Sequence, residues 1–382
     1  MPPIPLLLSA GEASGDMYAA RLATALQKRL DVQIFGMGGP QMRAAGVEIV
    51  MDYSEVAVVG ITEILKHLPS LLKAMDRIVA ETERREPALA ILTDFPGFHL
   101  RLARKLQRKG IRNVYYICPQ FWAWRPWRAN LIRRRFRKAL CIFPFEEKFF
   151  RGAGVSTEFI GHPLVGAVNA TKDRQQFCEE QGLDSSREVV TILVGSRTSE
   201  LAHHLPVVQE ACSRIHAKKP VQFVVAAAHP KDVEILKAGW PTGLTVRVVE
   251  GETYNALAAA DASIVSSGTA TVEACLLNAP MVVIYRVSPL TAALAKPLVR
   301  TDFFAMVNLI AEKEVVPELV QDDFRPERVA EETLRLLQDA NARETMKAGL
   351  AEVRRRLGPP GAVERAADEI ARLLRMTAGN AS

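Results

Sequence analysis

The sequence predicts an α/β protein built from two doubly wound domains, each a parallel sheet covered by helices. The chain has 382 residues, more than the roughly 250–300 at which one hydrophobic core stops growing, so two domains are expected. Short runs rich in Val, Ile and Leu alternate with longer stretches of helical period, which is typical of parallel sheets between helices. The 48% hydrophobic and 24% charged content indicates a globular protein and not a disordered or fibrous one.

The predicted strands form two sets, each run bounded by Gly, Pro or Ser. The first set covers residues 5–9, 32–36, 89–93, 113–118, 139–143 and 158–160. The second set covers residues 189–194, 221–227, 245–249, 262–265 and 280–285. Helical segments separate most of these runs, as in repeated strand–helix–strand units.

The domain boundary is predicted near residue 165, between Gly161-His162-Pro163-Leu164 and a polar helix at about 171–182. The domains are then 1–165 and 166–349. Ligands of doubly wound sheets bind at the carboxyl ends of the strands, so two such domains facing each other would place the active site in the cleft between them. Charged helices follow over about 326–376, with a break at Gly358-Pro359-Pro360-Gly361.

Several classes of protein are excluded at this stage. No apolar run approaches the ~20 residues of a membrane-spanning helix. Residues 4–10 follow no Lys or Arg, so we interpret them as the first strand of a cytoplasmic protein and not as a signal peptide. The five cysteines are odd in number and at least 23 residues apart, which argues against disulfides or a zinc site. No metal-ligand motif such as D-x-D or H-E-x-x-H is present, so neither a metal nor a cofactor is expected.

The positive charge is concentrated in one region. Residues 95–145 hold thirteen Lys and Arg and no acid; removing them from the 49 basic residues leaves 36, against 43 acidic ones. This region therefore predicts a partner with negative charge: phosphate, nucleic acid or an anionic membrane surface.

The first strand runs into Ser9-Ala10-Gly11-Glu12-Ala13-Ser14-Gly15-Asp16, before a predicted helix at 17–29. Small residues at such a turn expose backbone N–H groups to phosphate or sugar hydroxyls, so Ser14 and Gly15 are candidate contacts. The alternative is a tight turn with a capping residue. Neither this turn nor Gly36-Met37-Gly38-Gly39 has the full dinucleotide fingerprint, so a nicotinamide cofactor is not predicted.

Asp94 ends the third predicted strand. A carboxylate at the carboxyl end of a strand is well placed to act as a general base. The alternative is an N-cap for the helix predicted over residues 100–109.

Three of the four tryptophans lie within six residues, in Trp122-Ala123-Trp124-Arg125-Pro126-Trp127. Aromatic rings interleaved with Arg, here Trp124 and Arg125, offer stacking faces and phosphate donors to a sugar phosphate or nucleic acid. The alternative is a loop that packs into the domain core.

A one-sided apolar stripe runs over residues 61–79 and includes Ile64, Leu65, Leu68 and Leu72. Pro69 is expected to split it into two helices. The stripe could be a core face. It could also be an exposed patch that docks on lipid, because anionic membranes attract apolar and basic surfaces together.

In the second half, Gly195-Ser196-Arg197 ends a strand and places Arg197 where a diphosphate could bind. Ser267-Gly268-Thr269-Ala270-Thr271-Val272-Glu273 joins a strand to a helix. Its small residues would let a phosphate approach the helix N-terminus, and Glu273 could accept hydrogen bonds from ribose. A plain capped helix is the alternative.

These motifs resemble those of the lipid-A-disaccharide synthase family, in the same order and over essentially the whole chain. The stretches that carry the resemblance are Ser9 to Asp16, Trp122 to Arg125, Phe159 to Leu164, Gly195 to Arg197, Ser267 to Glu273 and Pro317 to Gln321. Three positions depart from the family pattern: Val194 and Val307 stand where Pro is usual, and His99 where Asn is usual, which could alter acceptor contacts.

The resemblance implies an inverting glycosyltransferase of GT-B architecture, whose last helices, here about 350–382, return to the first domain. It implies UDP-2,3-diacylglucosamine as donor and 2,3-diacylglucosamine 1-phosphate as acceptor. Asp94 would be the base, and Arg197 with the Gly268 helix would neutralise the diphosphate without a metal. The implied UDP-binding residues are Arg197, Ser267, Gly268, Thr269, Glu273 and Asn308.

The resemblance also implies a cytoplasmic enzyme that is peripheral on the inner face of the cytoplasmic membrane and binds no nucleic acid; a homodimer is compatible with it. Two alternatives stay open at this stage. One is another UDP-sugar transferase or an epimerase of the same architecture. The other is a basic RNA-binding protein that uses residues 133–138.

Overall fold

The computed structural model describes residues 2–55, 61–288, 292 and 301–378, and the side chains of 61–70, 377 and 378 lie outside the description. The chain divides into two compact units, Met1–Pro163 with Gly358–Ser382, and Leu164–Leu357. The chain re-enters the first unit at Gly358, later than the expected residue 350. Gly358 has a φ of 87°, and a Cβ there would lie 3.3 Å from Gly161 Cα, so the return takes place where only glycine fits comfortably.

The first unit contains a seven-stranded parallel sheet in the order β3-β2-β1-β4-β5-β6-β7. Its strands are β1 (Ile4–Ala10), β2 (Val32–Gly38), β3 (Glu48–Asp52), β4 (Leu89–Thr93), β5 (Asn113–Tyr116), β6 (Lys138–Cys141) and β7 (Thr157–Phe159). β1 pairs with β4 in a register that joins Leu6 to Leu89 and Ala10 to Thr93. Leu6, Leu7, Leu8 and all of β4 are buried, as expected for central strands covered on both faces.

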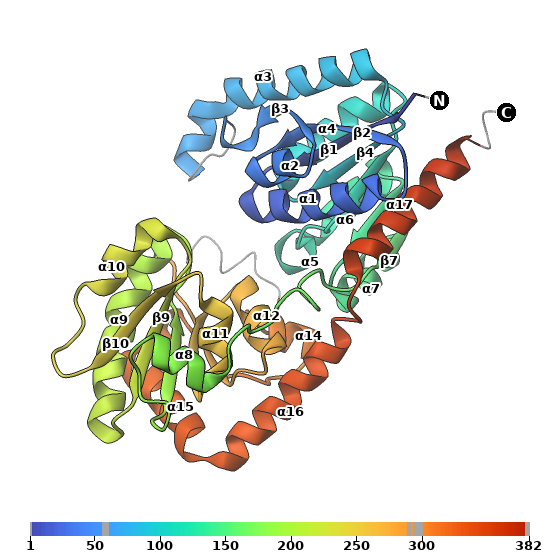
Figure 1. The fold of residues 1–382 in the computed structure, drawn as a ribbon. Helices are drawn as coiled ribbons and strands as arrows, with labels where there is room; N and C mark the ends of the chain where they lie inside the picture. Colours follow the sequence, from blue (N-terminus) through green and yellow to red (C-terminus); the bar gives the residue numbers. More distant parts are fainter. Residues whose placement is uncertain (1, 56–60, 289–291, 293–300, 379–382) are drawn as a thin grey trace. The chain divides into compact units, whose positions relative to one another are not determined.

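Helices cover this sheet (Figure 1). They are α1 (Ala13–Gln27), α2 (Pro40–Ala44), α3 (Ile61–Arg85), α4 (Pro96–Arg108), α5 (Phe121–Trp124), α6 (Ala129–Arg135), α7 (Pro144–Gly152) and α17 (Ala362–Ala378), with short 3₁₀ turns η1 (Tyr53–Glu55) and η2 (Pro126–Arg128). The split predicted at Pro69 was wrong, because α3 is one helix. A proline removes one backbone hydrogen bond, and α9 (Thr198–Lys218) also contains one, Pro206.

The C-terminal helix α17 packs against α1 in the first unit (Figure 1). Ala366, Ala367 and Ile370 are fully buried. Glu369 forms an ion pair with Lys138 of β6 at 3.0 Å. Burial together with this pairing fixes the last helix to the sheet that the N-terminal half of the chain builds.

The second unit contains a six-stranded parallel sheet in the order β10-β9-β8-β11-β12-β13. Its strands are β8 (Val189–Leu193), β9 (Gln222–Ala227), β10 (Thr245–Glu250), β11 (Ala262–Ser266), β12 (Met281–Tyr285) and β13 (Glu318–Val320). Its helices are α8 (Arg174–Glu180), α9, α10 (Val233–Lys237), α11 (Thr253–Ala258), α12 (Thr269–Leu276), α14 (Met306–Ala311), α15 (Pro326–Gln338) and α16 (Ala340–Arg356), with η3 (Pro230–Asp232) and η4 (Gln321–Asp323).

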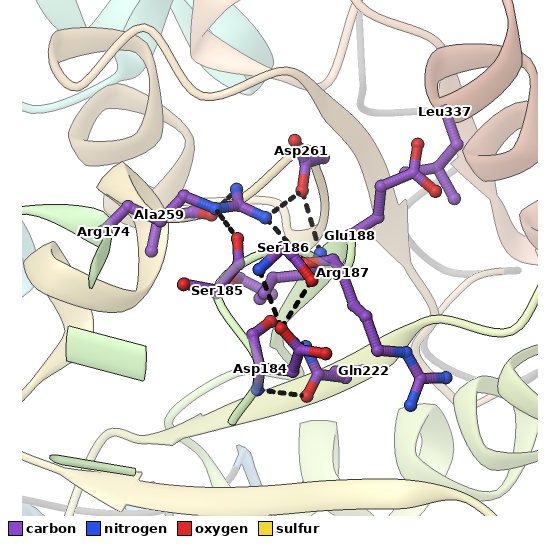
Figure 2. Close-up of polar contacts among 12 residues, drawn as sticks. Arg174, Asp184, Ser185, Ser186, Arg187, Glu188, Gln222, Ala259, Asp261 and Leu337 are labelled. Atoms are coloured by element: carbon purple, nitrogen blue, oxygen red, sulfur yellow. Dashed lines mark hydrogen bonds and ion pairs between the residues drawn. The ribbon is translucent and has the colours of Figure 1, made fainter. Parts of the chain in front are cut away.

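A polar network closes the amino-terminal edge of this second sheet, as Figure 2 shows. Arg174 of α8 donates to the carbonyl oxygens of Ala259 at 2.7 Å and Arg187 at 2.8 Å, and pairs with Asp261 at 2.9 Å. Asp261 in turn accepts from the Val189 N–H at 2.9 Å. These groups satisfy each other's hydrogen-bonding requirements, so the amino ends of the strands have a structural role here. Ligands are expected at the carboxyl ends of the strands.

Both sheets reverse their strand order at one point, between β1 and β4 in the first unit and between β8 and β11 in the second. Doubly wound sheets bind ligands at the carboxyl ends of the strands beside such a point. The structure confirms the two doubly wound domains that the sequence predicts, and it adds β3 and β13 to the predicted strands.

Candidate active site

Asp94 lies directly after β4, in a turn that the protein holds in an unfavourable backbone conformation. Asp94 and Phe95 have φ values of 54° and 39°, in the left-handed region that favours glycine. The carbonyl oxygen of Asp94 accepts hydrogen bonds from the Tyr115 hydroxyl at 2.7 Å and from His99 Nδ1 at 2.9 Å. The N-cap of α4 is Phe95, so the alternative in which Asp94 caps this helix is wrong.

The Asp94 carboxyl group is buried against the turn that follows β1. Its Oδ1 accepts the Gly11 N–H at 2.9 Å, whereas its Oδ2 has no hydrogen-bond partner within the described part of the chain. Burial raises the pKa of Asp94 well above its usual value; the charges of Glu12 and Asp16 raise it further, and the N–H groups of Gly11 and Glu12 oppose the rise. A carboxyl group with one free oxygen and a raised pKa is suited to accept a proton.

Two glycines of the first turn let it approach Asp94 this closely. A Cβ on Gly15 would overlap Asp94 Oδ2, and a Cβ on Gly11 would lie 2.5 Å from the Phe95 side chain. Ser14 is exposed in the first turn of α1. The glycines in this motif are therefore explained by contact with the Asp94 turn, and Ser14 faces solvent beside it.

Asp16, in contrast, has a structural role. Its carboxylate accepts from the N–H groups of Gly39 at 2.7 Å and Gln41 at 3.0 Å, at the beginning of α2. Asp16 thus joins the first turn to the second strand–helix turn.

His99 points inward and not toward a ligand site. It is fully buried, and burial lowers its pKa to about 4. Because the Asp94 carbonyl can only accept, Nδ1 of the neutral ring carries the hydrogen, and Nε2 accepts the Ser9 hydroxyl at 2.8 Å. His99 therefore positions the Asp94 turn; any change in acceptor contacts that results from His99 in place of Asn would act through this turn. The sequence gives no signal for this role of His99, Ser9 and Tyr115, because the role depends on contacts between β1, β5 and α4.

The tryptophan segment is only partly packed into the core. Phe121 is fully buried, but Trp124 and Trp127 are 37% and 60% exposed. The Arg125 guanidinium lies 4.5 Å from the centre of the Trp124 ring. Trp122 donates to Glu146 Oε1 at 3.2 Å, and burial raises the pKa of Glu146 to about 8. Trp122 anchors the loop, and Trp124 and Arg125 are presented at its surface.

The apolar stripe of α3 belongs to the core at its C-terminal end. Met75 and Ile78 are buried, whereas Leu72 is 46% exposed. The side chains of Ile64, Leu65 and Leu68 lie outside the described residues. Of the four proposed docking residues, Leu72 alone is therefore described, and it is exposed.

In the second unit, Arg197 lies at the start of α9 after β8. Its side chain is 72% exposed and pairs with Glu200 at 2.9 Å. The buried Glu200 also accepts the Ser196 N–H at 3.0 Å. A Cβ on Gly195 would lie 2.5 Å from Glu200 Oε2. Glu200 thus fixes the turn, and Arg197 extends from it with donors free for an anion.

The turn after β11 begins α12. Gly268 has a φ of 145°, and a Cβ there would meet none of the described residues within 4 Å. Thr269 is exposed, and the Ser267 hydroxyl donates to the Phe304 carbonyl at 3.0 Å. One turn into the helix, Glu273 accepts the Tyr254 hydroxyl at 3.0 Å, and burial raises its pKa. The arrangement leaves open space at a helix N-terminus beside an acceptor carboxylate.

Asn308 does not offer its side chain to a ligand. It is fully buried. Its amide donates to Val316 O and Glu318 Oε1, and its oxygen accepts the N–H groups of Val315 and Val316, at 2.7–3.0 Å. The expectation that Asn308 contacts UDP is therefore not supported; Asn308 braces the segment after α14.

No group of three or more His, Cys, Asp and Glu side chains among the described residues could hold a metal ion. No helix within the same part of the chain is both long and apolar enough to cross a bilayer.

Comparisons with known proteins concern the whole chain and its fold. A lipid-A-disaccharide synthase of Solibacter usitatus is 44% identical over 371 residues, covering 97% of each chain. The solved structure of Acinetobacter baumannii MurG aligns with a TM-score of 0.57 at 17% identity, covering 97% of this chain and all of that one. A UDP-GlcNAc 2-epimerase of Neisseria meningitidis aligns with a TM-score of 0.66 at 11% identity and the same coverage. These structures share the GT-B fold, and at such identities the likeness concerns the fold alone.

The family described as lipid-A-disaccharide synthetase matches residues 6–371. This match runs through both units and includes the turns at Asp94, Arg197 and Gly268. The chain belongs to the lipid-A-disaccharide synthetase family.

Proposed function

We propose that the chain is a hexosyltransferase that joins UDP-2,3-diacylglucosamine to 2,3-diacylglucosamine 1-phosphate. The products are the β(1→6) disaccharide 1-phosphate and UDP. The first unit would bind the acceptor and the second the nucleotide donor. Family membership supports this reaction over an epimerase or an RNA-binding protein, which the fold alone does not separate from a transferase.

Asp94 is the base in this proposal. The proton of the acceptor 6-hydroxyl passes to Asp94, the oxygen bonds to C1 of the donor sugar, and UDP leaves with the electron pair of the broken C1–O bond. One displacement inverts the configuration at C1. The free, buried Oδ2 of Asp94 carries the proposal, because such a group is costly unless it is used. Ser14 and the Trp124–Arg125 pair are proposed to contact the acceptor.

In this proposal the donor diphosphate binds where the second sheet reverses its strand order, between β8 and β11. This point, and the one between β1 and β4 in the first sheet, are called the switch points. Arg197 and the N–H groups around Gly268 and Thr269 would neutralise the developing charge on UDP. Ser267 borders this space, and Glu273 would accept hydrogen bonds from the ribose hydroxyls. No metal is invoked, since these groups supply the positive charge that the leaving group requires.

The enzyme would work at an anionic membrane surface as a peripheral protein on the cytoplasmic side. The exposed Leu72 and the basic residues of 95–145 support this part of the proposal. Ile64, Leu65 and Leu68 are proposed to dock with Leu72.

One assay tests the reaction. The protein is incubated with the diacylated donor and acceptor, and the disaccharide is sought by mass, with and without EDTA. We expect the product in both samples and a saturable UDP site by calorimetry, against weak, salt-sensitive RNA binding. Absence of the disaccharide, or a strict dependence on added Mg²⁺, contradicts the respective part of the proposal.

A further inference from the structure

An open groove of about 670 Å³ lies on the first unit, lined by residues of α3, α4, η2 and α6. It begins at Pro96 and Gly97, immediately after the Asp94–Phe95 turn, and continues along α4 to Arg108. The residues at this end of the groove therefore directly follow the turn that carries the proposed base.

The groove has an apolar interior. Met75 and Leu100 are buried at 3% and 4% exposure, and Leu131 is half-buried. Leu72 and Trp127, both exposed, also line the groove. An aliphatic surface of this kind suits an alkyl chain and has no evident use in binding a nucleic acid.

Most of the remaining lining is basic. Its described residues include Arg101, Arg104, Lys105, Arg108, Arg128 and Arg135, and none of those that line the groove is Asp or Glu. Lys105 pairs with Asp76 at 2.6 Å. Arg101 and Arg135 donate to the backbone carbonyls of Gly97 and Leu100. Within the described residues, Arg104 and Arg108 have no ion-pair partner. Elsewhere in the unit, arginines such as Arg29 and Arg85 are paired with carboxylates.

Burial and the excess of positive charge lower the pKa of Arg128 and of Arg135. Burial lowers the pKa of Arg128, and the charges of Arg125 and Arg101 lower it further. Burial and the charges of Arg104 and Arg134 act in the same way on Arg135. The Arg128 Nε–H is buried without an acceptor within the described part of the chain. An anion in the groove would relieve both deficits, since a guanidinium binds phosphate through paired hydrogen bonds.

We propose that this groove binds the acceptor lipid, with one acyl chain on the apolar interior and the 1-phosphate on the arginines. The proposal rests on the proposed function, because it assigns the acceptor to a place on the same unit as Asp94. The acceptor is favoured over a bulk phospholipid because the groove includes Pro96 and Gly97, the two residues that follow the Asp94–Phe95 turn.

The test compares two acceptors in detergent micelles, one with and one without the 1-phosphate. The variant is the double substitution Arg101→Ala and Arg104→Ala, two exposed side chains on α4 whose loss should leave the fold intact. We expect KM for the phosphorylated acceptor to rise at least about 10-fold, the scale of losing a charged hydrogen bond. KM for the donor should stay unchanged, and the variant should discriminate less between the two acceptors. Arg77→Ala, an exposed arginine of α3 outside the groove, is the matched control.

A second substitution tests the apolar interior. Leu131→Ser should weaken the dependence of KM on acyl-chain length, with a melting curve to confirm that the unit stays folded. If the double arginine variant has the same KM for the acceptor as the wild type, the proposal is overturned, provided that the wild-type protein forms the disaccharide. If the variant instead loses binding to anionic vesicles while its acceptor KM stays normal, the groove binds phospholipid and the proposal is also overturned. A wild-type protein that forms no disaccharide refutes the proposed function itself.

Discussion

The two switch points have the same topology and opposite chemistry. In the first unit, the turn beside β1 and β4 surrounds a carboxyl group: Gly15 lies against Asp94, and the free oxygen is buried. In the second unit, Arg197 beside β8 is exposed, and beside β11 a Cβ on Gly268 would contact none of the residues that the structure describes. The same strand order thus supports a site that shifts the pKa of one acid and a site that collects donors for an anion.

The two sites differ in how closely other residues pack against their glycines. Gly11 and Gly15 bring two turns into contact, so that protein replaces water around Asp94. A Cβ on Gly268, in contrast, would meet no atom of the described residues within 4 Å at the beginning of α12. Closure around an acid suits proton transfer, and an open helix N-terminus suits a diphosphate. Substitutions around Asp94 should therefore change the proton-transfer step and not UDP binding. Substitutions around Gly268 should change UDP binding and not proton transfer.

The largest effect is expected from Asp94→Asn. Loss of the general base should lower kcat by roughly 10²-fold or more, with little change in the affinity for UDP. Thermal stability should be equal or higher at neutral pH. The raised pKa of Asp94 stabilises the folded state below about pH 3.8, and this stabilisation is lost as the pH rises toward the folded-state value. The asparagine carries no such dependence.

Kinetics and melting curves on the same preparation check this prediction. Near-normal turnover would remove Asp94 from the chemistry. A strongly lowered melting temperature would instead indicate that the carboxyl group is needed for folding.

The next effect is expected from Glu273→Ala in the second unit. Deleting a hydrogen bond acceptor for ribose should weaken UDP binding by ~1–3 kcal/mol, measured by calorimetry. Tyr254→Phe removes the hydroxyl that donates a hydrogen bond to Glu273. It serves as the control for a merely structural role of Glu273. Unchanged UDP affinity in a folded Glu273→Ala variant would contradict the assignment, and an equal loss in both variants would favour the structural role.

A smaller effect is expected from His99, which acts through the backbone of Asp94. His99→Leu removes both hydrogen bonds of the ring and should lower kcat by roughly 10–100-fold, the scale of a small misplacement of a catalytic group. His99→Asn could restore a donor to the Asp94 carbonyl and should recover part of the activity. Because the pKa of His99 is about 4, the pH profile of His99→Asn should gain or lose no step above pH 5. Equal activity of the Leu variant and the wild type would show that the Asp94 turn keeps its conformation without the His99 hydrogen bonds.

The sequence predicted the parts of this comparison that depend on short segments. Apolar runs between Gly and Pro marked the central strands, and Asp94, Arg197 and Glu273 were singled out because they follow strands. β3 and β13 were missed, because edge strands such as Glu48–Asp52 carry acids and lack a continuous apolar run. The roles of His99 and Asn308 could not be predicted, since each depends on partners from other elements: Ser9 and Asp94 for His99, and Val315 to Glu318 for Asn308. The apolar stripe of α3 was ambiguous for the same reason: periodicity locates a face without saying what covers it.

The smallest effect is expected at Glu146, a second buried carboxyl group in the first unit, which tests whether burial alone makes an acid catalytic. Both of its oxygens accept hydrogen bonds, from Trp122 Nε1 and the Phe143 N–H, so Glu146→Gln should retain most activity. Its pKa is raised from 4.5 to about 8, so its stabilising contribution is complete below pH 4.5 and is lost as the pH rises to about 8.

Over that range the free energy of unfolding of the wild type should fall relative to that of Glu146→Gln, by up to about 1.4 kcal/mol per pH unit. This free energy corresponds to a fall in melting temperature of roughly 3–6 °C per pH unit in a unit of this size. At pH 5 the variant should be the less stable of the two, because its amide nitrogen cannot accept one of the two hydrogen bonds. Parallel melting curves from pH 5 to 9 would contradict the raised pKa of Glu146. A loss of turnover as large as that of Asp94→Asn would show that a free carboxylate oxygen is not what distinguishes the general base, Asp94, from other buried carboxyl groups.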